Sequence, residues 1–127
     1  MAIQPIETNQ APAAIGPYSQ GISAGAWHFV SGQLGMDPET GELVSEDVAG
    51  QAQQALENLK QIVEAAGCSL NQVVAVDVFL TDMGNFLEFN GIYEAFFSGH
   101  KPARAVVEVS ALPKGGCVEI KCTALVG

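Results

Sequence analysis

Arg104 is the only arginine of the 127-residue chain. It lies in an apolar stretch that begins at Ala103 and has the character of a β-strand. The alternation of a strand places Arg104, Val106 and Glu108 on one face. A guanidinium offers a fixed fork of donors that matches a carboxylate, and burying it without such a partner is costly. Arg104 is therefore predicted either to bind a ligand carboxylate or to form a structural ion pair.

Glu119 is the second residue with a capacity for chemistry. It stands between Val118 and Ile120 in the last apolar stretch of the chain. A carboxylate in an apolar strand can have a raised pKa, which suits proton transfer near neutral pH. The alternative is a solvated strand face that Glu119 shares with Lys121.

Four further residues are candidates for ligand contacts. Tyr18 could present its ring and hydroxyl to a ligand, or be a core residue with a wet tip. Ser31 and Gly32 end a predicted strand, where a glycine lets a ligand approach the backbone, although a plain turn is an equal alternative. Asn90 is a polar residue in a helix rich in phenylalanine, beside an apolar stripe or facing solvent.

The histidines and cysteines do not predict a metal site. His28 and His100 are far apart in sequence and lack a metal-ligand spacing. Cys68, Cys117 and Cys122 are odd in number and show no CxxC pattern. The chain begins without the features of a signal peptide and has no apolar run long enough to cross a membrane. We therefore expect reduced thiols in a cytoplasmic protein.

The first half of the chain predicts a hairpin and a long helix. Residues 17–34 form two β-rich runs around a turn at Ser23-Ala24-Gly25. Ser45 precedes two acidic residues and is a predicted helix N-cap. Apolar residues follow it at spacings of three and four over about five turns, and Gly67 ends the helix.

The second half alternates strands and a helix. Residues 73–80 are nearly all apolar, which predicts a strand covered on both faces. Asp82 is the predicted cap of a second helix, which carries an aromatic stripe and is closed by Gly99 and Pro102. Residues 103–109 and 117–126 are the last two predicted strands.

The order β-β-α-β-α-β-β predicts a single α+β domain over residues 1–127, with both helices on one face of a mixed sheet. The other face of this sheet is also apolar and needs a cover, for which another subunit is the expected source. Only 15% of the residues are charged, against about 25% in a typical domain. This shortage agrees with burial of apolar surface between subunits.

The charge balance argues against nucleic acid and anionic membranes as partners. The formal net charge is −9, and there are five basic residues against 14 acidic ones. The bases are scattered along the chain, whereas phosphate backbones are bound by clusters of Lys and Arg.

Several separated blocks of the sequence together resemble the Rid/YjgF family, which is also known as the endoribonuclease L-PSP family. The resemblance covers nearly the whole chain, from about Ala11 to Val126. In chain order, the blocks are Ala13-Ala14-Ile15-Gly16-Pro17-Tyr18-Ser19-Gln20-Gly21, Ser31-Gly32-Gln33, Asn90-Gly91-Ile92-Tyr93-Glu94-Ala95-Phe96-Phe97, Pro102-Ala103-Arg104, Val107-Glu108-Val109, Leu112-Pro113-Lys114 and Val118-Glu119-Ile120.

This resemblance implies a fold like that of the small chorismate-mutase-like homotrimers, with three clefts between subunits. It also implies an enamine/imine deaminase, a hydrolase that turns 2-aminoacrylate-type substrates into 2-keto acids and ammonia without a cofactor. By the same resemblance, Arg104 clamps the substrate carboxylate and Glu119 holds or activates the attacking water. The remaining expected lining of the substrate pocket is Tyr18, Ser31, Gly32, Asn90 and Val106.

One position departs from the family pattern. Deaminase-type members often carry a cysteine two residues after the arginine, where this chain has Val106. The change leaves the carboxylate clamp and the water site in place but alters the expected substrate range. Two other functions remain open: an endoribonuclease or translation inhibitor, which the net charge disfavours, and a non-enzymatic carboxylate-binding or chaperone-like trimer.

Overall fold

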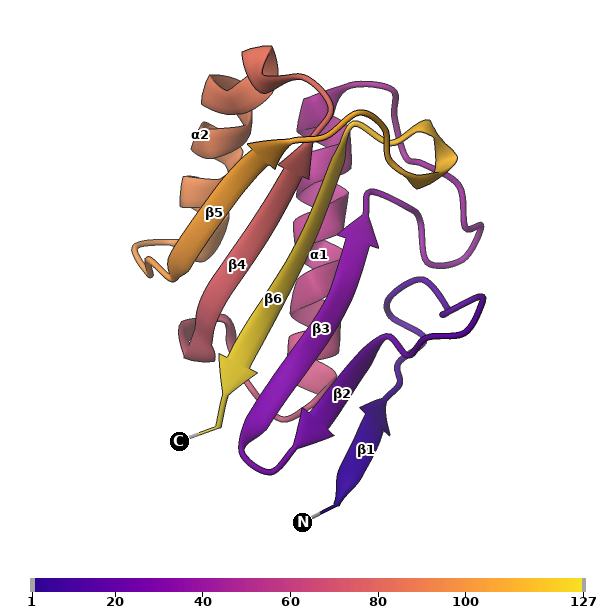
Figure 1. Cartoon of the computed structure of the whole chain (residues 1–127), viewed down its shortest axis with the longest axis vertical. Coiled ribbons are helices and arrows are strands. Elements are labelled where there is room, and N and C mark those ends of the chain that lie inside the picture. The colour runs from indigo at the N-terminus through magenta and orange to yellow at the C-terminus, as the bar shows by residue number, and fades with distance from the viewer. Residues whose placement is uncertain (1, 127) are drawn as a thin grey trace.

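A single mixed sheet forms the centre of the computed structural model, which describes residues 2–126 (Figure 1). Its strands are β1 (Ile3–Ile6), β2 (Gly21–Ala24), β3 (Trp27–Leu34), β4 (Val73–Leu80), β5 (Ala103–Glu108) and β6 (Val118–Leu125). They lie in the order β1-β2-β3-β6-β4-β5. Only β4 and β5 are parallel neighbours, and the helix between them makes the crossover that a parallel pair needs.

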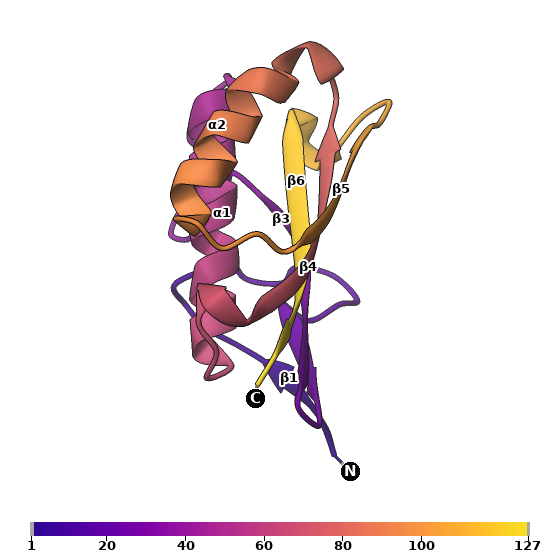
Figure 2. The same ribbon diagram turned by 90° about the vertical axis from the view of Figure 1, so that its left-hand side faces the viewer.

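The two long helices, α1 (Val48–Ala65) and α2 (Phe86–Phe97), cover the same face of the sheet (Figure 2). Apolar residues of α1 such as Leu56 and Ile62 are fully buried in a core that they share with strand residues such as Val78 and Ile120. The predicted α+β architecture with both helices on one face is therefore confirmed.

The prediction missed strand β1. It pairs antiparallel with β2 at the edge of the sheet, from Ile3 opposite Ala24 to Ile6 opposite Gly21. Only Ile6 of this strand is buried, and Pro5 interrupts its donors, so the segment lacks the alternation that marks a strand. The observed order is therefore β-β-β-α-β-α-β-β.

The predicted cap of α1 was wrong by two residues. The N-cap is Asp47, whose carboxylate accepts a hydrogen bond from the backbone N–H of Gly50 at 2.8 Å. The Ser45 hydroxyl instead donates to the Asp47 carboxylate at 3.0 Å. These two bonds, the backbone one foremost, lower the pKa of Asp47.

The predicted cap of α2 also belongs to a different element. Asp82 accepts from Gly84 N–H at 2.8 Å and caps a short 3₁₀ turn, Met83–Asn85. Helix α2 begins after that turn. Within its aromatic stripe, Phe89, Tyr93 and Phe97 are buried as predicted. The other two members, Phe86 and Phe96, are partly buried at the edge of the core.

One face of the sheet points away from the helices, and we call it the open face. No other element within residues 2–126 covers it. On β4, Val76, Val78 and Leu80 are buried but alternate with residues that stay partly exposed. Within one chain, β4 is covered on one face only, because both helices pack on the same side, and the cover of the other face by another subunit stays a prediction. The open face carries Trp27, Phe29 and Val107, each 44–47% exposed.

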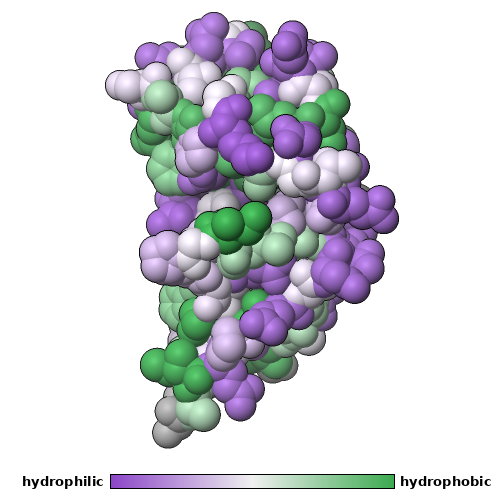
Figure 3. Space-filling model, turned by 90° about the vertical axis from the view of Figure 1, so that its right-hand side faces the viewer, coloured by the Kyte–Doolittle hydropathy of each residue, from purple (hydrophilic) through white to green (hydrophobic). Residues whose placement is uncertain are grey.

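On the side of the molecule that lies at the right of Figure 1, separate hydrophobic patches lie between mostly polar side chains (Figure 3).

Candidate functional site

Arg104 faces helix α2. Its Nη1 donates a hydrogen bond to Asn90 Oδ1 at 2.7 Å, and its guanidinium carbon lies 4.7 Å from the centroid of the Tyr93 ring. Within residues 2–126, the structure gives Arg104 no ion pair. A structural ion pair with an acid of the same chain is therefore not observed in this part of the chain, and the exposed guanidinium retains N–H groups for a ligand.

A cavity of about 470 Å³ opens beside Arg104, between α2 and β5. Arg104 of β5 lines it with Asn90, Tyr93 and Glu94 of α2, and the loop before β5 forms the rest of its wall. Val106 follows on the same strand face as predicted, but it is partly buried and packs against the core rather than lining this cavity. Strand alternation thus assigned Val106 to the correct face. The predicted place of Val106 in the wall of the substrate pocket is not observed in the single chain.

Glu119 points to the open face, because its neighbours Val118 and Ile120 are both buried in the core. Burial raises the pKa of the Glu119 carboxyl, and the positive charge of Lys121 partly offsets this effect. The Lys121 ammonium lies 4.0 Å from a carboxylate oxygen of Asp77. Glu119 is therefore a half-buried acid without an ion-pair partner within 4.0 Å in the described residues.

Gly32 lies directly against Glu119. A Cβ atom added at Gly32 would come within 2.5 Å of Glu119 Oε2, so only a glycine admits the carboxylate in its present position. Both residues line a cavity of about 910 Å³, together with Tyr18 and Ser31. The Ser31 hydroxyl donates to the Ser19 carbonyl and so holds the chain on which Tyr18 lies.

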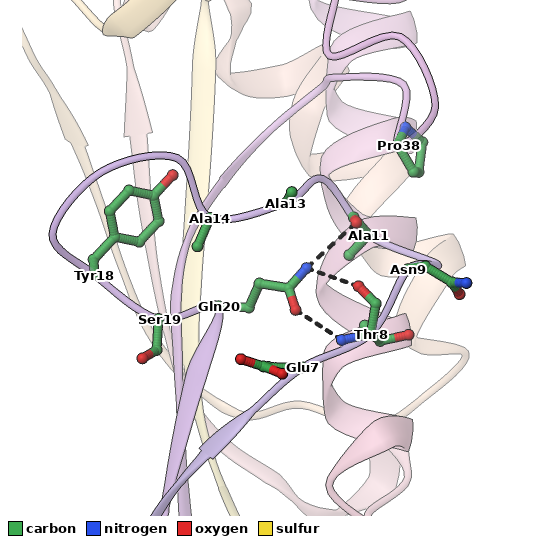
Figure 4. A pocket seen from close by; sticks show the side chains of 10 residues that line it. All are labelled: Glu7, Thr8, Asn9, Ala11, Ala13, Ala14, Tyr18, Ser19, Gln20 and Pro38. Atoms are coloured by element: carbon green, nitrogen blue, oxygen red, sulfur yellow. Dashed lines mark hydrogen bonds between the residues drawn. The ribbon is translucent and has the colours of Figure 1, made fainter.

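Gln20, a residue for which no role was predicted, holds the segment that carries Tyr18. The buried Gln20 amide accepts from Thr8 N–H at 2.8 Å and donates to the Thr8, Ala11 and Pro12 carbonyls. Figure 4 shows the Gln20 side chain directed at the segment that contains Thr8 and Ala11, whereas the Tyr18 ring lies on the other side of Gln20. Gln20 lies within the first sequence block that resembles the family, and this was the signal that could have singled it out.

The predicted site residues thus fall into two half-sites on opposite faces of the sheet. The Arg104 half-site, with Asn90, faces α2, whereas the Glu119 half-site faces the open side. Strand β4 separates β5 from β6, and the two cavities share no lining residue. One chain therefore does not bring Arg104 and Glu119 together.

Residues 2–126 contain neither a candidate metal site nor a membrane-spanning helix. No group of three His, Cys, Asp or Glu side chains is arranged to hold a metal ion. No helix in this part of the chain is both long and apolar enough to cross a membrane.

The sequence and the fold both match known proteins. The family model for endoribonuclease L-PSP matches residues 8–126. A RutC family protein of Sinorhizobium fredii is 54% identical over 119 residues, which cover 94% of each chain. A 2-iminobutanoate/2-iminopropanoate deaminase of Mus musculus is 49% identical over 122 residues, covering 96% of this chain and 90% of the relative. The crystal structure of Escherichia coli TdcF with bound serine superposes with a TM-score of 0.93 at 43% identity, covering 98% of this chain and 99% of the other.

Proposed function

Because the chain belongs to the Rid/YjgF family, the endoribonuclease L-PSP family, we propose that it hydrolyses small imines that carry a carboxylate. The products are a 2-keto acid and ammonia. The observation that carries this proposal is the half-buried Glu119 beside Gly32, combined with an arginine whose partner is an amide and not an acid. The naming of a 49% identical relative as an imine deaminase supports the same reaction.

In this proposal the complete site forms between two copies of the chain. The two half-sites lie on opposite faces of one sheet, so a neighbouring subunit has to supply the missing half. The apolar open face needs a cover, and a homotrimer with three clefts would provide it while joining Arg104 of one subunit to Glu119 of the next.

Arg104 would hold the substrate carboxylate and fix the imine carbon. Asn90 Oδ1 occupies one N–H of the guanidinium and the Tyr93 ring supports its plane, so the orientation of the remaining N–H groups is set before a ligand arrives. Holding the substrate in a reactive geometry can lower the barrier by several kcal/mol, on the order of 7–11 in the best intramolecular cases.

Glu119 would then manage the proton of the attacking water. Water adds to the C=N carbon while the Glu119 carboxylate takes one of its protons and passes it to the nitrogen, which gives a carbinolamine. Glu119 then takes the hydroxyl proton of the carbinolamine and transfers it to the nitrogen, so that the C–N bond breaks, the C=O bond of the ketone forms and ammonia leaves. A raised pKa suits this exchange, because the same group has to accept and donate a proton.

Keto-acid release from 2-aminoacrylate generated in a coupled reaction tests the activity. We expect the wild-type protein to accelerate release, and both Arg104→Ala and Glu119→Gln to bring the rate close to that without protein. Rates that equal the uncatalysed reaction for several imines would contradict the enzyme proposal. Binding of 2-oxobutanoate that is lost in Arg104→Ala would then favour the non-enzymatic carboxylate-binding module.

Mixed assemblies test the shared cleft. If Arg104→Ala and Glu119→Gln subunits are unfolded, mixed equally and refolded together, roughly a quarter of the interfaces combine an intact arginine with an intact glutamate. Activity should return to about that fraction, while each variant refolded alone stays inactive. No recovery from assemblies shown to contain both variants would contradict a site built from two subunits.

A further inference from the structure

Two of the five basic residues of the chain, Lys101 and Arg104, line one cavity. Neither forms an ion pair within residues 2–126, where the described pair is Lys121 with Asp77. The chain as a whole is strongly acidic, with a net charge of −9. Two cations without an ion pair that line one concave site in such a chain indicate an anionic ligand, because the cavity walls concentrate their field.

The other polar groups of this cavity leave the two cations available. His100 Nε2 lies 2.7 Å from the Val73 carbonyl oxygen, and because a carbonyl only accepts, this nitrogen donates and anchors the ring. Glu94 is the one acid in the wall, so the charged groups here sum to one positive charge. A ligand with two negative charges would therefore meet two cations and one opposing carboxylate.

The backbone around Lys101 is constrained rather than free. Ser98 and Gly99 both have positive φ, 51° and 97°, and turn the chain sharply away from α2. Pro102 has a fixed φ and leads directly into β5, so it sets the offset between Lys101 and Arg104. The cavity of about 470 Å³ lies in the range typical of small-molecule sites, roughly 300–1,000 Å³, and exceeds the needs of a three-carbon acid.

We propose that Lys101 is a specificity-determining residue that selects imines with a second carboxylate on their side chain. Arg104 holds the carboxylate next to the C=N group, and Lys101 binds the distal one. This inference rests on the proposed function and adds to it a substrate class, the imines of dicarboxylic amino acids.

The test compares 2-iminoglutarate with 2-iminobutanoate, each generated in place by an amino-acid oxidase. For Lys101→Met we expect kcat/KM on 2-iminoglutarate to fall about five- to tenfold, mainly through KM, with little change on 2-iminobutanoate. Lys60→Met removes the same charge from helix α1 and should leave the ratio of the kcat/KM values for the two substrates unchanged. Glu94→Gln should shift that ratio in the opposite direction, toward 2-iminoglutarate.

Calorimetric titration with 2-oxoglutarate and 2-oxobutanoate separates this inference from the proposed reaction. If no imine is hydrolysed, the enzyme proposal fails, yet a selective loss of 2-oxoglutarate affinity in Lys101→Met still supports the two-point site. An equal loss of affinity for both acids, or no loss for either, would overturn the role of Lys101.

Discussion

Glu119 shows how much the chemistry of a single residue depends on what its strand places beside it. The carboxylate is half-buried on a sheet face, and Gly32 leaves room for it where any Cβ would collide. Burial raises its pKa more than Lys121 lowers it. A glutamate with the same sequence neighbours on a solvated surface would have neither the partial burial, nor the close approach to a glycine, nor the raised pKa.

The pH dependence of stability provides one prediction. Since the pKa of Glu119 is higher in the folded state, the folded protein holds this proton more tightly than the unfolded one. From the ordinary value of 4.5 up to the raised value, the free energy of unfolding should therefore decrease as pH rises. In Glu119→Gln this contribution should vanish, as measured by urea unfolding across the pH window. The exposed Glu88→Gln variant serves as the control, and an unchanged slope in Glu119→Gln would refute the prediction.

Substitution of Gly32 should impair activity more than folding. In Gly32→Ala the new methyl group has to displace the Glu119 carboxylate, so we expect kcat to fall at least tenfold, on the order of 1.4 kcal/mol in the barrier. Gly91→Ala is the matched control, because nothing lies within 4 Å of its added Cβ and alanine favours a helix by about 1 kcal/mol. Full activity in a folded Gly32→Ala protein would contradict this contact.

At the scale of elements, strand alternation was the most reliable guide to the site. It placed Arg104, Val106 and Glu108 on one face, and all three do lie on the helix side of the sheet: Arg104 contacts Asn90 of α2, Val106 packs on the core, and Glu108 accepts from the N–H of Met83 in the 3₁₀ turn at 2.7 Å. Helix starts were less predictable. Ser45 and Asp47 are both good N-caps by residue type, and the choice between them depended on the residue at which the backbone becomes helical.

The N-terminal segment depends on one buried side chain. Gln20→Ala removes four hydrogen bonds to residues 8–12 and leaves their backbone groups without a partner, at a cost of roughly 1–3 kcal/mol per buried group. We expect a lower free energy of unfolding and a higher KM, because Tyr18 loses its support. Gln20→Glu should not rescue the protein, since a carboxylate cannot donate to the three carbonyls. The exposed Gln10→Ala serves as the control, and wild-type KM in Gln20→Ala would rule out this positioning role.

At the scale of the whole molecule, one face of the sheet is covered by the helices and the other is exposed in the single chain. The helices cover one side of the sheet (Figure 2). Trp27, Phe29 and Val107 remain exposed on the other side. The low charged fraction of the sequence already indicated such a surplus of apolar surface.

A charge on the open face should therefore break the assembly. Phe29→Asp places a carboxylate where the proposed trimer excludes water, which costs several kcal/mol, on the order of 2–7, unless it is paired. We expect a monomer by sedimentation velocity and a loss of imine hydrolysis. Leu87→Asp, at a position 82% exposed on α2, should keep the wild-type mass and activity. An unchanged mass in Phe29→Asp would mean that the open face is not the interface.

The sequence by itself determined the fold class, the faces of the strands and the identity of the family. These follow from local periodicity and from separated motifs in a fixed order, both of which are present in the linear chain. It could not reveal β1, because a short edge strand has partners on one side only and shows no alternation.

Only the tertiary structure decided how the candidate residues are grouped. It placed Arg104 with Asn90 and Lys101, and Glu119 with Gly32, in two cavities on opposite faces. Which residues share a cavity depends on the order of the strands and on the side where the helices pack. Both are set by burial of the core between residues far apart in the chain, and no local pattern encodes them.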